Sequence, residues 1–306
     1  MLSFASQIGQ SLNLSLVYKY AILRSMAKQN GTKINWLEKH LPEGLLVDAA
    51  WLGKHGYSTS LRSQYVSAGW LEQPTRQVYR RQRGSLKWEH VVISLQALLE
   101  YPLVVGGRTA LDLQGYSHYL TRTTNEVHLY GPEAPPHWLQ KLSLKTRYRY
   151  HNSRKLFAAD HIGRLPNLDW DPNANRSKVV GPRDAAVVTL PWGAWDWPLT
   201  VSTPERAILE LLDELPKYES FHQADQLMDG LRSLSPRRLQ RLLAECHSVK
   251  VKRLFFFFAE RHKHAWLKKL DKHEVDFGKG KRMLAKGGKL DRSYQITVPE
   301  DLNAVQ

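Results

Sequence analysis

Hydrophobic residues recur with helical spacing on both sides of Gly56, which predicts two helices joined by a tight turn. Four residues form the apolar face of the first helix: Val47, Ala50, Trp51 and Leu52. Ser58 is placed to cap the second helix, because a serine hydroxyl accepts a hydrogen bond from a free backbone N–H of the first turn. In that second helix Leu61, Tyr65 and Val66 recur on one stripe, which we expect to be buried.

A hairpin is predicted directly after these helices. Residues 70–72 and 78–80 alternate between apolar and polar side chains, and the segment 73–76 between them, Gln-Pro-Thr-Arg, is typical of a turn. Two helices followed by such a hairpin indicate a winged helix-turn-helix, a module that commonly binds DNA.

The outward face of the second helix carries hydrogen-bonding groups and a guanidinium but no acid, which suits the reading of base edges in a major groove. This predicted reading face comprises Ser58, Thr59, Ser60, Arg62, Ser63 and Gln64. The hairpin adds four cations that we expect to hold phosphates or enter the minor groove: Arg76, Arg80, Arg81 and Arg83. A purely structural helix pair and a winged helix that binds only protein remain alternatives.

The rest of the chain mixes strand-like and helical patterns. Strands are expected at 103–105, 127–130, 144–150, 154–157, 185–190, 195–201 and 294–298. Helices are expected at 14–28, 34–40, 88–100, 109–120, 221–231, 236–245 and 249–262, and one more begins at Pro204 with Thr203 as its cap. The predicted class is therefore α+β, with a winged-helix domain at 1–90 and a larger mixed α+β domain at 91–306.

The composition indicates which kind of partner the chain binds. The chain of 306 residues is 42% hydrophobic, enough for packed cores, and carries a formal net charge of +15. Such an excess indicates a polyanionic partner, most commonly nucleic acid. The single cysteine, Cys246, excludes an internal disulfide and fits a reducing cytoplasm. No apolar run approaches the roughly twenty residues of a membrane span, so we expect a cytoplasmic protein without membrane contact.

The glycine- and lysine-rich segment near the C-terminus resembles a phosphate-binding loop only in part. Arg282 stands where that loop needs a hydroxyl to hold the metal ion, which argues against nucleotide binding. The segment does supply a second basic cluster, which is either a solvated face or a surface that contacts phosphates of nucleic acid. Its members are Lys279, Lys281, Arg282, Lys286 and Lys289.

No arrangement of residues predicts catalysis. His262, His264 and His273 do not converge and are expected at the surface, and Asp169 and Asp171 lack a third acidic partner. We therefore predict no catalytic residue, no metal site and no cofactor. The alternative function is a nucleic-acid enzyme, a nuclease or nucleotidyltransferase, that uses the winged helix for targeting; it would need clustered carboxylates for a metal ion.

Long sequence blocks resemble the AbiEi-type antitoxins, transcriptional regulators of type IV toxin–antitoxin (abortive-infection) systems. The blocks are the winged-helix segment with YVSAGWLE and VYRR, then VVGGRTALDLQGYSHYL, VSTPERAILELLDELP, SVKVKRLFFFFAE and DFGKGKRMLAKGGKLDRSYQITVP. The chain departs from the family pattern at Gln77, where wings of this family often carry glycine, and this affects where Arg76 points.

The resemblance implies three properties. The N-terminal domain is expected to bind inverted repeats in double-stranded DNA of its own promoter, and so to repress the operon. The C-terminal domain is expected to carry the antitoxin activity, and the partner is expected to be a nucleotidyltransferase toxin. Direct contact with the toxin, modification of the toxin and competition for its target all remain open.

Overall fold

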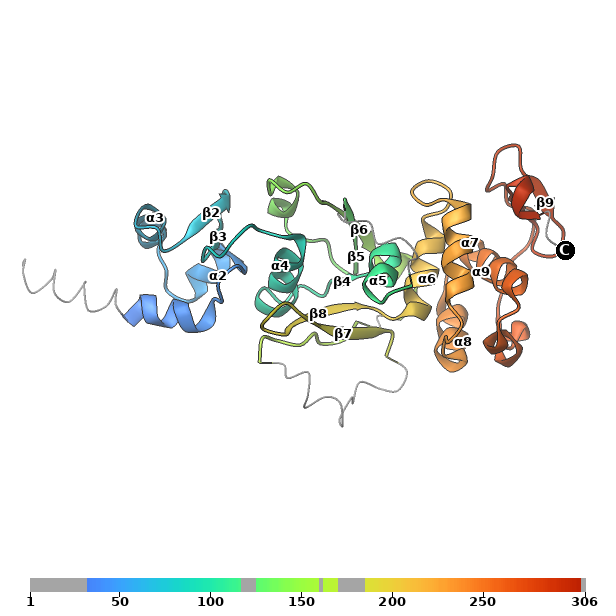
Figure 1. Cartoon of the computed structure of the whole chain (residues 1–306), viewed down its shortest axis with the longest axis horizontal. Helices are drawn as coiled ribbons and strands as arrows, with labels where there is room; N and C mark the ends of the chain where they lie inside the picture. Colours follow the sequence, from blue (N-terminus) through green and yellow to red (C-terminus); the bar gives the residue numbers. More distant parts are fainter. Residues whose placement is uncertain (1–31, 117–124, 160–161, 170–184, 304–306) are drawn as a thin grey trace, which may run out of the picture. The chain divides into compact units, whose positions relative to one another are not determined.

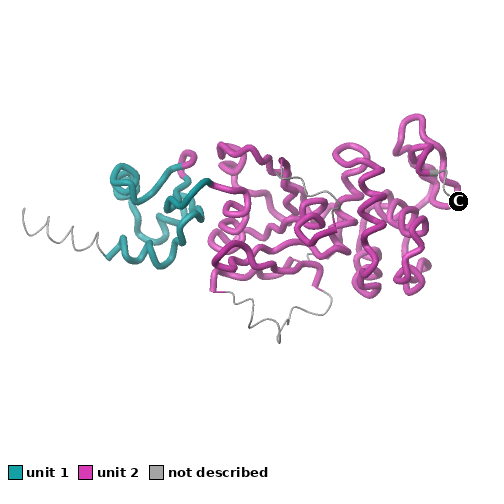
Figure 2. Tube along the Cα trace, viewed as in Figure 1, with its two compact units in different colours: residues 1–73, 78–85 teal, residues 74–77, 86–306 magenta. Residues whose placement is uncertain are grey.

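The structure is a computed structural model that describes residues 32–116, 125–159, 162–169 and 185–303 (Figure 1). The chain divides into two compact units, which Figure 2 colours separately. One comprises Met1–Gln73 and Val78–Ser85, and the other comprises Pro74–Gln77 and Leu86–Gln306. The domain boundary predicted at residue 90 lies close to the break between Ser85 and Leu86. The structure has the mixed α+β class that the sequence predicts.

The first unit has the element order of a winged helix. A helix at 32–40 precedes strand β1 (Leu46–Asp48) and the helices α2 (Ala49–Lys54) and α3 (Thr59–Ser67). Strands β2 (Glu72–Thr75) and β3 (Val78–Arg80) then form the wing, and the sheet order is β1-β3-β2.

Side-chain caps define where the helices α2 and α3 begin. The Asp48 carboxylate accepts from the Trp51 N–H at 2.8 Å, and the Ser58 hydroxyl accepts from the Leu61 N–H at 3.3 Å, which confirms the predicted Ser58 cap. Val47, predicted on the first helix, lies instead in β1 opposite Tyr79. The prediction was wrong there because the Asp48 cap starts the helix after Val47.

A five-stranded sheet forms the centre of the second unit, in the order β6-β5-β4-β8-β7. Its strands are β4 (Val104–Val105), β5 (Glu126–Gly131), β6 (Arg147–Asn152), β7 (Val187–Trp192) and β8 (Trp197–Ser202). The pairs β5–β6 and β4–β8 are parallel, whereas β4–β5 and β7–β8 are antiparallel. Expected strands near 103–105, 127–130, 144–150, 185–190 and 195–201 are thus present with shifted ends.

Helices pack against this sheet and then form a group of their own (Figure 1). The helix α4 (Trp88–Ile93) continues as a π-helical turn (Ser94–Leu98), and α5 (Gly107–Leu113) follows β4. The later group consists of α6 (Pro204–Asp213), α7 (Phe221–Gly230), α8 (Pro236–Glu245) and α9 (Val249–His262). A hairpin of β9 (Lys289–Asp291) and β10 (Ile296–Val298) lies near the C-terminus.

Short 3-10 turns connect several of these elements. They cover His137–Lys141, Ser153–Lys155, Ala265–Lys269, Lys272–Glu274 and Glu300–Asn303. The turn at Ser153–Lys155 replaces the strand predicted at 154–157, where Phe157 forms only an isolated bridge to Cys246. The prediction was wrong there because the two buried residues, Leu156 and Phe157, are adjacent and do not alternate as in a strand.

A buried carboxylate joins two of the family sequence blocks. Glu210 of α6 accepts from the Gly107 N–H at 3.0 Å, from the Ser202 hydroxyl at 3.1 Å and from Arg206 Nε at 2.7 Å. Gly106 makes this approach possible, since a Cβ at that position would lie 2.2 Å from Glu210 Oε2. The start of α5 and the middle of α6 are therefore fixed to each other through one side chain.

Other predictions for this unit had mixed outcomes. Phe255 to Phe258 are buried, as expected, and Cys246 is buried immediately after α8. Thr203 occupies the cap position of α6, but its hydroxyl makes no capping hydrogen bond. The helix at 14–28, the end of the helix at 109–120 and Asp171 lie outside the described residues. None of the helices in the described ranges has the length and apolar character needed to cross a membrane.

Candidate nucleic-acid interface and histidine cluster

The outward face of α3 is polar and free of acids, as predicted. Ser58, Thr59, Ser60, Ser63 and Gln64 are all exposed. The opposite side of the helix is anchored by Leu61 and Tyr65, which are 8% and 3% exposed. Because the apolar stripe fixes how α3 is rotated, the short polar side chains are held toward solvent.

Arg62 has partners inside the first unit. Its Nη1 donates to the Ala49 carbonyl at 2.9 Å, and its Nη2 donates to the Thr59 hydroxyl at 2.8 Å. The guanidinium carbon lies 5.8 Å from the centre of the Tyr79 ring. Arg62 thus links α3 to the start of α2 and to the wing, which gives it a positioning role in the unbound protein.

The wing arginines differ strongly from one another in exposure. Arg80 is 4% exposed, its Nε lies 2.6 Å from Glu72 Oε2, and its Nη2 donates to the Gly84 carbonyl. A guanidinium buried in this way does not reach a phosphate, so Arg80 holds the wing strands together instead.

Glu43 neutralises two more of these arginines. Arg81 lies 3.3 Å from one Glu43 oxygen and also donates to the carbonyls of Glu38 and Leu41. Arg83 lies 3.3 Å from the other Glu43 oxygen, with a more exposed side chain. The sequence did not reveal the pairing of Arg81 and Arg83, because Glu43 stands about forty positions before them.

Arg76 is the exception. It is exposed in the turn between β2 and β3, and within the described residues it makes no hydrogen bond or ion pair. The next residue, Gln77, has a φ of 65°, in the left-handed region that glycine adopts without strain. The backbone of this turn therefore has the conformation that a family glycine would favour, although the residue is glutamine.

The second basic cluster is exposed throughout. Lys279, Lys281, Arg282, Lys286 and Lys289 all have exposed side chains. Arg253 of α9 fixes the backbone next to the first three of these residues, because its guanidinium donates to the carbonyls of Phe277, Gly280 and Gln295.

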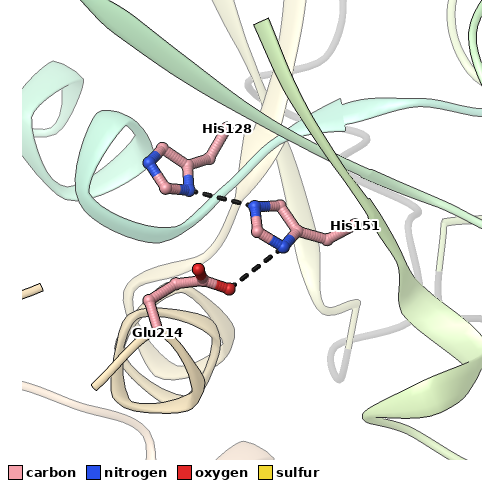
Figure 3. Close-up of side chains that lie close together, drawn as sticks. All are labelled: His128, His151 and Glu214. Carbon is pink, nitrogen blue, oxygen red and sulfur yellow. Dashed lines mark hydrogen bonds and ion pairs between the residues drawn. The ribbon is translucent and has the colours of Figure 1, made fainter. Parts of the chain in front are cut away.

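The second unit also brings together three residues that sequence reasoning did not connect. His128 of β5, His151 of β6 and Glu214, which ends α6, point toward one another (Figure 3). His128 Nδ1 lies 3.1 Å from His151 Nε2, and His151 Nδ1 lies 3.0 Å from Glu214 Oε1. One donor atom from each residue lies within 4.8 Å of the other two.

Burial controls the electrostatics of this cluster. Burial, together with the neighbouring His151, lowers the pKa of His128 to about 4, so the His128 imidazole is neutral near pH 7. The hydrogen bond from Arg149 holds the pKa of Glu126 below its usual value, so Glu126 is ionised there. Glu126 Oε1 lies 3.4 Å from His128 Nε2.

The cluster was missed because the signal is spread over distant positions. The parallel register places Tyr130 opposite His151 and His128 opposite Arg149, so alternate residues of β5 and β6 share one face. Both strands were predicted from the sequence, but their pairing was not. Of the three histidines predicted at the surface, His273 is exposed as expected. His264 is instead buried and hydrogen-bonded to the Met228 carbonyl, and His262 is half-buried beside Asp225.

Comparisons with known proteins agree with the fold. A crystal structure of the RV2827C protein from Mycobacterium tuberculosis is similar, with a TM-score of 0.51 at 15% identity. The match covers 86% of this chain and 88% of the other. A comparison with curated protein sequences finds no match.

Two family matches cover nearly all of the described chain. Residues 30–122 match the N-terminal domain of the AbiEi antitoxin transcriptional regulators. Residues 124–299 match the description "Transcriptional regulator, AbiEi antitoxin, Type IV TA system". The chain therefore belongs to the AbiEi antitoxins, the transcriptional regulators of type IV toxin–antitoxin systems.

Proposed function

We propose that this antitoxin represses its own operon by binding inverted repeats in the promoter, and that it counteracts a nucleotidyltransferase toxin. The observation that carries the first part is the exposed, acid-free polar face of α3. A helix with this composition suits the major groove, where short hydroxyl and amide side chains reach base edges. Repression of a promoter would take place in the cytoplasm.

The α3 face supplies the base contacts in this proposal. Gln64 would pair with an adenine through both polar atoms of its amide, and Ser60 and Ser63 would contact neighbouring edges or phosphates. Arg62 would hold α3 in its orientation relative to α2. It would contact bases only if its hydrogen bond to the Ala49 carbonyl or to the Thr59 hydroxyl were broken. Ser58 and Thr59 lie at the start of the helix, where phosphates bind.

The wing supplies the phosphate or minor-groove contacts. Arg76 is exposed and without a partner among the described residues, so it serves this role without losing an ion pair. Arg83 and Arg81 would contribute after giving up part of their interaction with Glu43. Arg80 is left out of the interface because it is buried against Glu72.

The test is fluorescence anisotropy with the promoter duplex and a scrambled duplex at several salt concentrations. Gln64→Ala should weaken promoter binding by about 1–3 kcal/mol and leave the scrambled duplex unaffected. Gln226→Ala is the matched control, because Gln226 is an exposed helical glutamine of the second unit. Equal losses of Gln64→Ala on both duplexes would remove α3 from base recognition.

The second basic cluster is proposed as a further contact for nucleic-acid phosphates. Its support is five exposed cations, of which Lys279, Lys281 and Arg282 lie next to the Gly280 carbonyl that Arg253 holds. The double variant K279Q/K281Q should lower the salt dependence of nucleic-acid binding by up to two phosphate contacts. The control K268Q/K269Q removes two exposed lysines outside the cluster, and an equal effect in the control would contradict a dedicated surface.

We also propose that the chain acts by binding and does not catalyse a reaction. A nuclease or nucleotidyltransferase activity remains the alternative, and incubation with DNA or RNA and Mg²⁺ tests it. Turnover that a single carboxylate substitution abolishes would overturn the proposal.

Toxin neutralisation has its own test. Expression of the neighbouring toxin gene with and without this chain should show rescue of growth. Rescue by a chain that lacks the first unit would place the antitoxin activity in the second unit, as the family implies.

A further inference from the structure

We propose that His128, His151 and Glu214 form a binding site for a divalent transition-metal ion of the zinc class. The site lies wholly in the second unit, and it depends neither on DNA binding nor on the identity of the toxin. It adds a ligand to a protein for which the sequence predicts no metal.

The donor set fits such an ion. Two imidazole nitrogens and one carboxylate oxygen are ligands that zinc and its neighbours prefer, and a three-ligand set leaves further coordination positions open. The three residues come from β5, β6 and the end of α6, so three separate elements converge on one point (Figure 3). The side chains are 7%, 17% and 7% exposed, which limits the freedom of the donors.

Contacts outside the three donors hold both rings in place. Glu126 Oε1 lies 3.4 Å from His128 Nε2, which leaves His128 Nδ1 facing His151. The Tyr130 ring lies parallel to the His151 ring, with centres 4.5 Å apart and planes 13° apart. Metal-bound histidines commonly have a carboxylate on their other nitrogen, and such partners orient the ligand.

The two imidazole nitrogens are spaced almost as a tetrahedral site requires, whereas Glu214, which now contacts the other nitrogen of His151, would turn toward the ion. With Zn–N bonds of about 2.0–2.1 Å, two nitrogens of a tetrahedral site lie about 3.3 Å apart. The observed separation is 3.1 Å, and the nitrogens now face each other along a hydrogen bond. The two rings would tilt so that both lone pairs point to an ion beside the line that joins the nitrogens.

The site has a route to solvent. His151 and Glu214 line an open pocket together with Arg149, Lys217 and Lys250. Two of these cations are already paired, Arg149 with Glu126 and Lys250 with Asp213, which reduces their repulsion of an incoming ion. An exogenous ligand would occupy the remaining coordination positions from this side.

Calorimetric titration of the full, chelator-treated chain with Zn²⁺ tests the proposal. We expect one ion per chain, and Co²⁺ in its place should give the visible absorption of a site with four or five ligands. His151→Asn and Glu214→Gln should each weaken Zn²⁺ binding by roughly tenfold or more. His222→Asn is the control, because His222 is an exposed histidine paired with Asp301.

Imidazole NMR signals of the unmodified chain keep the test independent of whether the variants fold. Zn²⁺ should shift the signals of both His128 and His151. The proposal is overturned if Zn²⁺ does not bind saturably at micromolar concentrations. It is equally overturned if bound Zn²⁺ leaves these two imidazoles unchanged, or if His222→Asn loses as much affinity as His151→Asn.

Discussion

The wing turn and the interior of the second unit use arginine in opposite ways. In the wing turn Arg76 is exposed and makes no ion pair within the described residues. In the second unit Arg206 is 1% exposed and pairs with the fully buried Glu210. The same residue type is thus exposed to solvent in one place and part of a buried ion pair in the other. Net charge indicates that a polyanion binds, but exposure and pairing decide where it binds.

The difference extends to the neutral polar groups. Around Glu210, a backbone N–H and a hydroxyl add to the Arg206 contact, so the carboxylate is satisfied inside the protein. On α3 the polar atoms of Ser60, Ser63 and Gln64 face solvent. A surface that leaves its donors and acceptors to water can exchange water for base edges at low cost.

The largest expected effect is that of breaking the buried pair. Glu210→Ala leaves the Arg206 guanidinium buried without a counter-charge and should destabilise the second unit by about 3–5 kcal/mol. Urea unfolding of the full chain measures this loss. The control is Glu260→Ala, which breaks the exposed pair with Lys272 and should cost less than about 1 kcal/mol. If both variants lost the same small free energy of unfolding, the buried pair would contribute no more to stability than the exposed pair.

The wing contains the same contrast on a smaller scale. Arg80→Ala removes a partly buried, charged hydrogen bond to Glu72 and should destabilise the first unit by about 1.5–3 kcal/mol. Arg76→Ala should leave stability unchanged and reduce the salt dependence of DNA binding by about one phosphate contact. Stability is measured by thermal unfolding and binding by anisotropy. If Arg76→Ala unfolds the wing, or Arg80→Ala affects only binding, the assignment of the two roles is reversed.

Local signals were sufficient for most of the helices. The predicted limits of α8 and α9 agree with the structure because Ser235 and Ser248 cap them, with Pro236 in the first turn of α8. Local signals failed at Val47, whose apolar side chain fits either a helix or a strand. Pairing with Tyr79 decides the matter, and that contact spans more than thirty positions.

The candidate sites show the same limit. The polar face of α3 was predictable because one helical period determines it. The neutralisation of Arg81 and Arg83 was not, since Glu43 meets them only after the sheet forms. The histidine cluster depends on the parallel register of β5 and β6 and on the packing of α6 beside them. None of these contacts produces a periodic pattern of residues in the sequence.

The wing turn provides a smaller test. Gln77 has a positive φ, and a β-branched side chain there should destabilise the wing by about 1–2 kcal/mol, so Gln77→Val is expected to be destabilising. Gln77→Gly removes the backbone strain of the positive φ and should not destabilise the folded turn. Glycine also raises the conformational entropy of the unfolded chain, which offsets part of this stabilisation. Thermal unfolding of the two variants compares them directly. A stable Gln77→Val would show that the turn adapts to its side chain.

The smallest expected effect concerns the interior of the second unit. Cys246 is 3% exposed, and burial raises the pKa of its thiol to about 11, so almost no thiolate is present at pH 8. We expect negligible reaction with a thiol reagent in the native protein and complete reaction after unfolding. Because the chain has one cysteine, the signal reports on that position alone. Rapid native labelling would show that α8 and its surroundings open readily, and the contrast between an exposed first-unit surface and a closed second-unit interior would then fail.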